Sequence, residues 1–208
     1  CASVSDQLPS LMGAQPVTTI APLDPGPLND VLANRRIETW YQPVVTAGSY
    51  QLWGHECLMR ARDEHGQLIS PKQIIDWARQ EQLTFMLDRL CRETHLFNAG
   101  QADLPDHTHV LINFLPTTVY DPNYCLRTTV RAAEKANIAP ERIIFEVVES
   151  EQVEDREHLL SILAYYRNAG FSVALDDVGT GYSGLMMLAE MNPDLIKIDR
   201  ALVSRAPE

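Results

Sequence analysis

Two adjacent carboxylates, Asp176 and Asp177, are the residues of this sequence whose type and spacing point most directly to chemistry. They end a short apolar run, and a glycine-rich segment, residues 179–184, follows them. Neighbouring carboxylates raise each other's pKa unless a cation neutralises them, and glycines let the backbone turn sharply and approach a ligand. The pair therefore predicts a metal site at the mouth of an α/β fold. Taken alone, such a pair more often forms a solvated turn that closes a strand, and the metal site is favoured only because other acidic residues end other strands.

Further polar residues lie near the carboxyl ends of other predicted strands. From the apolar runs we expect strands at residues 40–45, 50–60, 110–113, 143–147, 172–176 and 194–198. The polar candidates on or just after them are Glu56, Asn113, Glu146, Asp176, Asp177 and Lys197. Because the carboxyl ends of parallel strands meet on one face of the fold, we expect these side chains to converge.

The chemistry of this set is that of hard oxygen ligands beside one lysine. Carboxylate and amide oxygens suit Mg²⁺ or Mn²⁺, whereas zinc prefers histidine and cysteine. The ammonium group of Lys197 could neutralise a developing oxyanion or orient a water molecule. Carboxylates that bridge two metal ions, with a lysine nearby, are typical of metal-assisted phosphodiester hydrolysis.

Each candidate also has a plainer interpretation. Glu56 could be an exposed strand residue without a role, and Asn113 a polar strand end that hydrogen-bonds to the backbone. Glu146 could pair with a cation in the core, and Lys197 could lie on the surface of an edge strand. The metal site is favoured because all these residues fall at the same end of their predicted strands.

The elements that must position these residues alternate along the chain. We expect helices at residues 28–34, 71–81, 84–98, 124–136, 154–168 and 182–190. Ser70, Pro71 and Gln73 form a helix-start pattern, and Gly100 is expected to end the helix that precedes it. Strands that alternate with helices of this length imply a parallel sheet, whereas the first two strands are expected to pair through the turn at Gly48.

Composition excludes several classes of protein. The chain has 208 residues, is 45% hydrophobic and carries a net charge of −11, which argues against a partner such as long nucleic acid. No apolar run reaches the ~18 residues of a membrane span. The four cysteines match no metal-binding or disulfide pattern. We therefore expect reduced thiols and a cytoplasmic location, either alone or as the cytoplasmic domain of a larger, membrane-bound protein. The proline-rich residues 1–27 are expected to be a linker or the tail of a preceding domain.

Six ordered segments between about residues 28 and 204 resemble the motifs of EAL domains, the bacterial cyclic di-GMP phosphodiesterases. Tyr41 to Val45 is similar to the opening strand motif, and Glu56-Cys57-Leu58-Met59-Arg60 to the E-A-L-x-R signature. The other matching segments are Asn113–Pro116 (N-L-S-P), Glu146–Ser150 (E-x-T-E-S), Asp176–Ser183 (D-D-F-G-T-G-Y-S) and Lys197–Arg200 (K-I-D-R).

The resemblance implies an α/β fold, a modified TIM barrel whose first strand runs antiparallel to the others. It implies hydrolysis of cyclic di-GMP to linear pGpG at a site with two Mg²⁺ or Mn²⁺ ions. By matching position, Glu56, Asn113, Glu146 and Asp176 would hold one ion, and Asp176 and Asp177 the second.

The remaining roles implied by the resemblance concern catalysis and substrate. Lys197 would stabilise the attacking hydroxide or the leaving oxygen, and Glu56 would also belong to the catalytic set. Glu149 would brace the loop at 177–184, which contributes to a homodimer in the family. The residues implied to contact the cyclic dinucleotide are Gln42, Leu58, Arg60 and Asp199.

The chain also departs from the family pattern. Cys57 replaces Ala, Val178 replaces Phe, and the E-G-V-E and Q-G-Y segments that follow K-I-D-R in the family are not found. We therefore expect an EAL domain over residues 28–208 that is incomplete at its C-terminal end and lacks the last barrel strands. Two other functions stay open: a non-catalytic module that binds cyclic di-GMP or a protein partner, and a structural tail of a sensor or membrane protein.

Overall fold

A single mixed sheet organises the molecule. In the structure, a computed structural model, residues 26–148, 155–179 and 184–204 are described. The sheet has seven strands in the order β1-β2-β4-β5-β6-β7, with β3 pairing with β2. The strands are β1 Ile37–Val45, β2 Leu52–Arg62, β3 Leu68–Ile69, β4 His109–Asn113, β5 Ile143–Val148, β6 Ser172–Val178 and β7 Leu195–Ile198.

The direction of the strands matches the predicted fold class. β1 runs antiparallel to β2, whereas β2, β4, β5, β6 and β7 are parallel to one another. The expected barrel-type α/β fold with an antiparallel first strand is thereby confirmed. Successive parallel strands are joined through helices, which is the connection that a parallel sheet requires.

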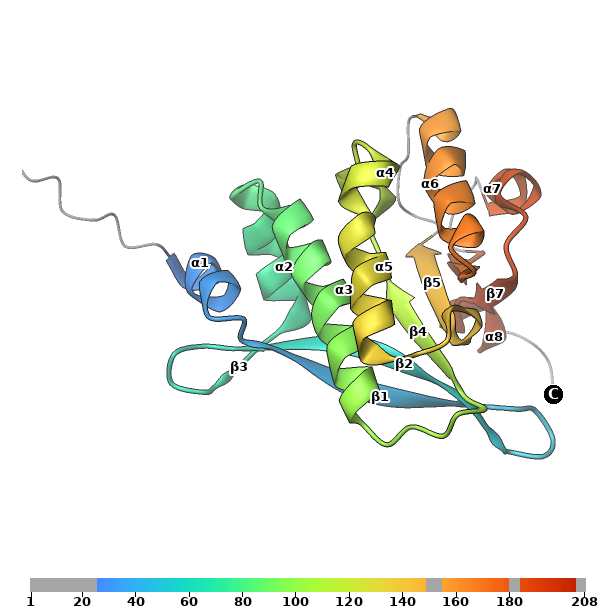
Figure 1. Cartoon of the computed structure of the whole chain (residues 1–208), viewed down its shortest axis with the longest axis horizontal. Helices are drawn as coiled ribbons and strands as arrows, with labels where there is room; N and C mark the ends of the chain where they lie inside the picture. The colour runs from blue at the N-terminus through green and yellow to red at the C-terminus, as the bar shows by residue number, and fades with distance from the viewer. Residues whose placement is uncertain (1–25, 149–154, 180–183, 205–208) are drawn as a thin grey trace, which may run out of the picture.

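The helices gather on one face of the sheet. They are α1 Gly26–Ala33, α2 Pro71–Gln80, α3 Thr84–Gln101, α4 Pro122–Cys125, α5 Arg127–Ala136, α6 Arg156–Asn168, α7 Gly184–Met191 and α8 Arg200–Val203, with short 3₁₀ turns at Pro116–Thr118 and Pro140–Arg142. In Figure 1, α2, α3, α5 and α6 all lie on the same side of the strands. None of the helices described here is both long and apolar enough to cross a membrane.

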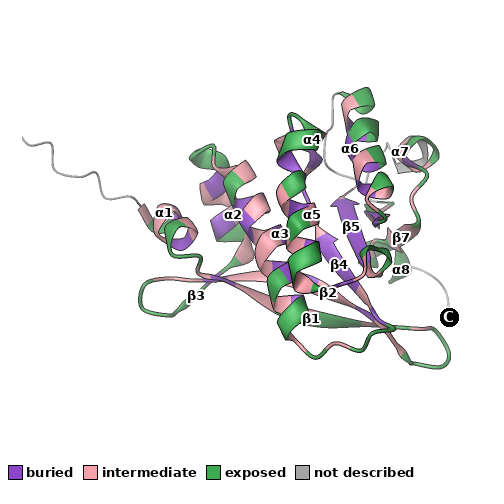
Figure 2. Cartoon of the chain, viewed as in Figure 1, coloured by how far each residue is buried: buried purple, intermediate pink, exposed green. Residues whose placement is uncertain are grey.

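Alternation along the strands separates two faces of the core. Ile112, Phe145 and Leu175 point into the large apolar cluster beneath the helices. Their neighbours Leu111 and Ile144 point the other way, into a small cluster inside the curved sheet. Figure 2 shows the buried central strands. Because side chains alternate with a period of two, residues that share an inward direction also share a layer.

The predicted start of α2 is correct, but the predicted end of α3 is wrong. The hydroxyl of Ser70 accepts a hydrogen bond from the backbone N–H of Gln73 at 3.2 Å, and Pro71 occupies the first turn. Gly100, in contrast, lies inside α3, which continues to Gln101. A Cβ at position 100 would lie 2.5 Å from the carbonyl oxygen of Ala136 in α5, so this glycine permits close helix packing.

Several boundaries differ from those predicted. The expected helix at 124–136 consists of α4 and α5, which meet at Leu126. Strand β2 extends to Arg62, two residues beyond the predicted strand end, and Glu56 lies within it, six residues before Arg62. β3 and α8 were not predicted. Residues 1–25 of the expected linker lie outside the described residues.

Candidate functional site

The candidate site is a polar layer that stands on an apolar layer inside the curved sheet. The apolar layer contains Leu111, Ile144 and Ala174, with Trp53 and Leu195 packed against them. Two residues further along β4, β5, β6 and β7 come Asn113, Glu146, Asp176 and Lys197. Because alternate residues of a strand face the same side, the strands that bury the apolar layer also aim this polar set inward.

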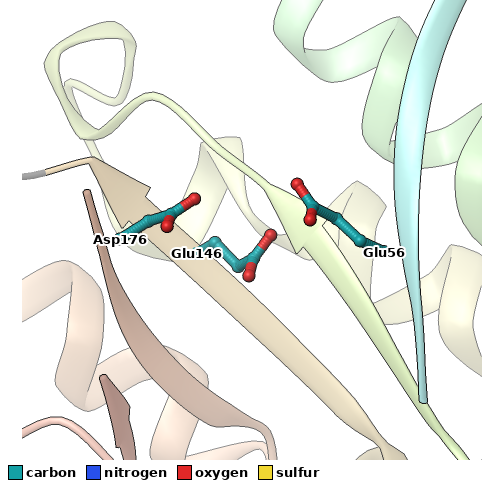
Figure 3. A group of neighbouring side chains, drawn as sticks. All are labelled: Glu56, Glu146 and Asp176. Carbon is teal, nitrogen blue, oxygen red and sulfur yellow. The ribbon is translucent and has the colours of Figure 1, made fainter. Parts of the chain in front are cut away.

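Three carboxylates from three strands meet in this layer. Glu56 on β2, Glu146 on β5 and Asp176 on β6 each offer an oxygen, and these oxygens all lie within 4.8 Å of one another. Figure 3 shows the three side chains pointing toward one another from their separate strands. Asn113 borders the group, since its Nδ2 lies 3.5 Å from Oε1 of Glu56. The predicted convergence of these four residues is what the structure shows.

The ammonium group of Lys197 lies at the centre of this triad. Its Nζ is 2.8 Å from Oε1 of Glu146, 2.8 Å from Oδ2 of Asp176 and 3.2 Å from Oε2 of Glu56. Burial opposes the charged form of Lys197, but the surrounding carboxylates outweigh this effect and raise the pKa of its ammonium group. If all groups are ionised, three carboxylates and one ammonium leave a local charge of −2.

Glu146 is the most constrained member of the site. Its side chain is fully buried, and burial raises its pKa to about 7, although Lys197 acts in the opposite direction. Oε1 forms an ion pair with Lys197 but no hydrogen bond that meets the geometric criteria. Oε2 has no hydrogen-bond partner in the described part of the chain. A buried carboxylate oxygen without a partner is costly, so its persistence marks a candidate functional group.

The Asp176–Asp177 pair lies in an irregular part of β6. The register with β7 shifts between Leu175 and Val178, and Asp177 has a positive φ of 55°. The backbone N–H of Asp177 donates to Oδ1 of Asp176 at 2.8 Å. This bulge turns Asp177 outward beside the inward Asp176. Burial, together with Asp176 and Asp199, raises the pKa of Asp177, partly opposed by Lys197.

The predicted substrate contacts lie on β1, on β2 and just after β7. Gln42 of β1 pairs with Glu56 of β2 in the antiparallel register. Leu58 and Arg60 follow on the same face of β2 and border a cavity of about 440 Å³ that also reaches Asn113. Asp199 follows β7, two residues after Lys197, and is the N-cap of α8, where its Oδ1 accepts from the N–H of Ala201 at 2.6 Å. Glu149 lies outside the described residues.

One residue near the site was missed at the level of sequence. Asp88 on α3 accepts a hydrogen bond from the backbone N–H of Leu115 at 3.0 Å, two residues after Asn113. It thereby ties the segment that follows β4 to the helix layer. The available signal was the spacing of Asp88 and Arg92, one helical turn apart, but nothing local indicates the contact with Leu115.

The donor set fits a hard divalent cation. The triad supplies carboxylate oxygens. Asn113 would add its amide oxygen if its side-chain amide were flipped, so that Oδ1 rather than Nδ2 faced Glu56. No histidine or cysteine belongs to the group of ligand atoms found among the described residues. Mg²⁺, Mn²⁺ and Ca²⁺ prefer such oxygen donors, and the excess negative charge would be reduced by binding them.

Comparison with known proteins gives a consistent family match. The family model described as "EAL domain" matches residues 27–208. A curated relative, the probable cyclic di-GMP phosphodiesterase PdeG of Escherichia coli K12, is 33% identical over 180 residues, which are 86% of this chain and 35% of the relative. The chain thus spans about a third of the length of this curated relative.

Solved structures with related folds include ligand complexes. A standalone EAL protein from Vibrio cholerae O395 in a c-di-GMP-bound form has a TM-score of 0.68 and 32% identity, and the match covers 81% of this chain and 68% of that protein. BlrP1 from Klebsiella pneumoniae, in a calcium/cy-diGMP complex, has a TM-score of 0.71 and 27% identity over 83% of this chain and 42% of that protein. A manganese/cy-diGMP complex of BlrP1 matches with a TM-score of 0.65 and 25% identity, over 85% of this chain and 47% of that protein.

Proposed function

This chain belongs to the EAL domain family, and from that premise we propose that it is a metal-dependent phosphodiesterase that opens cyclic di-GMP to linear pGpG. The observation that carries the proposal is the set of three carboxylates whose oxygens lie within 4.8 Å, around one lysine ammonium. The curated relative PdeG is named a probable cyclic di-GMP phosphodiesterase, which supports the same substrate.

The proposed cofactor is a pair of Mg²⁺ or Mn²⁺ ions. Glu56, Asn113, Glu146 and Asp176 would hold one ion, and Asp176 and Asp177 the other. The partnerless Oε2 of Glu146 and the excess negative charge support this assignment. When bound, the ions would polarise the phosphodiester and lower the pKa of a nearby water molecule.

The protein's own residues would orient the substrate and balance its charge. Lys197 is proposed to stabilise the attacking hydroxide or the leaving oxygen. Its Nζ contacts all three carboxylates in this structure, so it would give up some of these contacts when an ion is bound to them. Gln42 and Arg60 stand on the same face as Glu56 and are proposed to contact the nucleotide. Asp88 would hold the segment after Asn113 in place through Leu115.

The proposal extends to the setting of the domain. We propose a cytoplasmic protein that acts as a homodimer, in which residues 1–27 connect the EAL domain of residues 28–208 to an upstream sensor or regulatory domain. Glu149 is proposed to brace the loop at 177–184, and this loop is proposed to contribute to the homodimer. The name of one matching solved structure, a standalone EAL protein, indicates that an upstream domain is not a requirement of the fold.

Turnover of cyclic di-GMP with Mn²⁺ or Mg²⁺ tests the proposal directly. The intact protein should convert cyclic di-GMP to pGpG, and removal of divalent ions with EDTA should abolish the reaction. Glu146→Gln should lower kcat at least about 100-fold. Removing a metal ligand should reduce activity at least as much as removing a residue that only orients such a ligand through a hydrogen bond. The matched control is Glu64→Gln, in the exposed turn before β3, which should leave turnover unchanged.

Binding without turnover would point to a different function. If the intact protein bound cyclic di-GMP but never cleaved it with either metal ion, the phosphodiesterase proposal would be wrong and a receptor function would replace it. If turnover persisted in EDTA or in Glu146→Gln, the metal assignment would be wrong.

A further inference from the structure

An exposed tryptophan stands on the same face as the proposed substrate contacts. In the β1–β2 register, Trp40 pairs with Leu58, as Gln42 pairs with Glu56. The alternate residues Cys57 and Ala61 are buried in the apolar clusters under the helices. Because side chains alternate across a strand, Trp40 shares the face of Glu56 and lies away from the helices.

Trp40 also lies at the level of the mouth of the site. Parallel pairing of β2 with β4 ends at Cys57, and β2 then continues to Arg62 with only β1 and β3 beside it. The extra length forms a two-stranded ribbon beyond the carboxylate triad. Trp40 is level with Leu58, two residues past Glu56, which corresponds to about 7 Å along the strand. A base linked through one ribose to a phosphate at the triad is within this reach.

The ring of Trp40 is exposed yet held in place by polar partners. The residue is 45% exposed. Its indole N–H donates to Oε2 of Glu38 at 3.3 Å, and the guanidinium carbon of Arg60 lies 4.9 Å from the ring centroid. The other tryptophans, Trp53 and Trp77, are instead packed against apolar clusters. A fixed aromatic surface that remains open to solvent is what stacking on a nucleobase requires.

We propose that Trp40 binds the substrate by stacking its indole ring on one guanine base of cyclic di-GMP. This inference rests on the proposed function and adds a substrate-binding residue to it. Arg60, which lies against the same ring, would border the same base, and Glu38 would keep the indole in its orientation. The triad would then hold the scissile phosphodiester while the ribbon of β1 and β2 holds a base.

Binding and turnover of Trp40 variants in the intact protein test the inference. Binding is measured by titration of cyclic di-GMP with Ca²⁺ as the divalent ion, with a chromatographic check that the nucleotide stays intact. Trp40→Ala should weaken binding about 5- to 150-fold, the range expected for one stacked base. KM should rise similarly while kcat stays within about threefold, and Trp40→Phe should restore most of the affinity because it keeps an aromatic face.

Tryptophan fluorescence gives a second readout with a matched control. Cyclic di-GMP should quench the fluorescence of the wild type and of Trp77→Phe, whereas Trp40→Phe should lose most of the quenching. Trp77 lies on α2 within an apolar cluster and serves as the same substitution away from the site.

The outcomes separate this inference from the proposed function. If the wild type cleaves cyclic di-GMP but Trp40→Ala binds it as tightly as the wild type, stacking by Trp40 is wrong and the phosphodiesterase proposal stands. The same holds if quenching persists in Trp40→Phe, or if Trp40→Ala changes only the oligomeric state. If the wild type neither binds nor cleaves the nucleotide, both are wrong.

Discussion

Two clusters of charged residues lie inside this protein, and they are built in opposite ways. The helix-side cluster contains Asp88 and Arg92, whose side chains are 4% and 0% exposed and 2.6 Å apart. The cluster at the mouth of the sheet contains Glu56, Glu146 and Asp176 around Lys197. One balances a carboxylate with a guanidinium, whereas the other places three carboxylates against one ammonium.

The helix-side cluster is satisfied by its own neighbours. Asp88 accepts from Nε and Nη2 of Arg92 and from the backbone N–H of Leu115. Nη1 of Arg92 donates to Thr129 at 2.5 Å and to the hydroxyl of Tyr166 at 3.2 Å. A buried ion pair of this kind needs such hydrogen bonds, because otherwise desolvation outweighs attraction. Its role is therefore to connect α3 with α5, α6 and the segment after β4.

The residues of the cluster at the mouth do not satisfy one another's charge and hydrogen-bonding needs. Glu146 is fully buried with one oxygen that lacks a hydrogen-bond partner in the described chain, and its pKa is raised to about 7. A protein under selection for stability alone would not retain this arrangement, since like charges and burial both disfavour it. The balance of charge, rather than burial itself, therefore distinguishes a structural cluster from a candidate functional one.

The largest expected effect is the loss of stability when the helix-side cluster is disrupted. Asp88→Asn should lower the free energy of unfolding by about 3–5 kcal/mol, because it leaves the buried guanidinium of Arg92 uncompensated. Denaturant unfolding measures this. The matched control is Asp76→Asn: Asp76 pairs with Lys72 at the same helical spacing and at 2.6 Å, but on the surface. That variant should change stability by less than about 0.5 kcal/mol, and equal losses in the two variants would contradict the comparison.

A second prediction concerns a buried group on the helix side that stays neutral. His95 on α3 is 3% exposed, hydrogen-bonds to Thr39 through Nδ1 at 2.8 Å, and has a pKa lowered to about 4 by burial. The unfolded chain binds a proton on this ring below its ordinary pKa of 6.5, whereas the folded protein does not until about pH 4. The contribution of His95 to stability is therefore full above pH 6.5 and is lost as the pH falls toward 4.

Unfolding measured across this pH range checks the prediction. Between pH 6.5 and pH 4 the wild type should lose about 3 kcal/mol relative to His95→Asn, beyond their difference at pH 8. A constant difference between the two proteins at every pH would show that His95 does not remain neutral in the folded state.

The smallest of the three predicted effects concerns completion of the cluster at the mouth. Mn²⁺ at 100 times its dissociation constant should stabilise the wild type by about 2.7 kcal/mol, because it binds the folded state alone. Glu146→Gln should lose most of this stabilisation, and without metal it should be more stable than the wild type, since a buried charge is removed. Thermal unfolding with and without Mn²⁺ measures both. Asp76→Asn, on the surface of α2, should keep the full response to Mn²⁺, and loss of the response in that variant would contradict the assignment.

Local patterns predicted most of the elements around the site. The alternation of apolar runs and amphipathic stretches indicated the parallel strands and the helices between them, and the antiparallel first pair was expected from the turn at Gly48. The boundaries were less predictable, because β2 continues past the predicted end where it pairs with β1 and β3. The local sequence predicts a helix end at Gly100, because glycine commonly follows the last turn of a helix. Its actual role, close contact with Ala136, depends on how α3 and α5 pack and is not encoded locally.

Strand alternation alone predicts which residues could form a metal site, because the period of two along each strand places one polar residue above each apolar residue that faces inward. How these residues combine depends on the packing of the strands and helices. The lengths and registers of β1 and β2 bring Trp40 level with Leu58, and the curvature of the sheet brings Lys197 to the centre of three carboxylates. The physical reason is that alternation is a local property of the backbone, whereas register, curvature and the tie from Asp88 to Leu115 arise from packing between segments far apart in the chain.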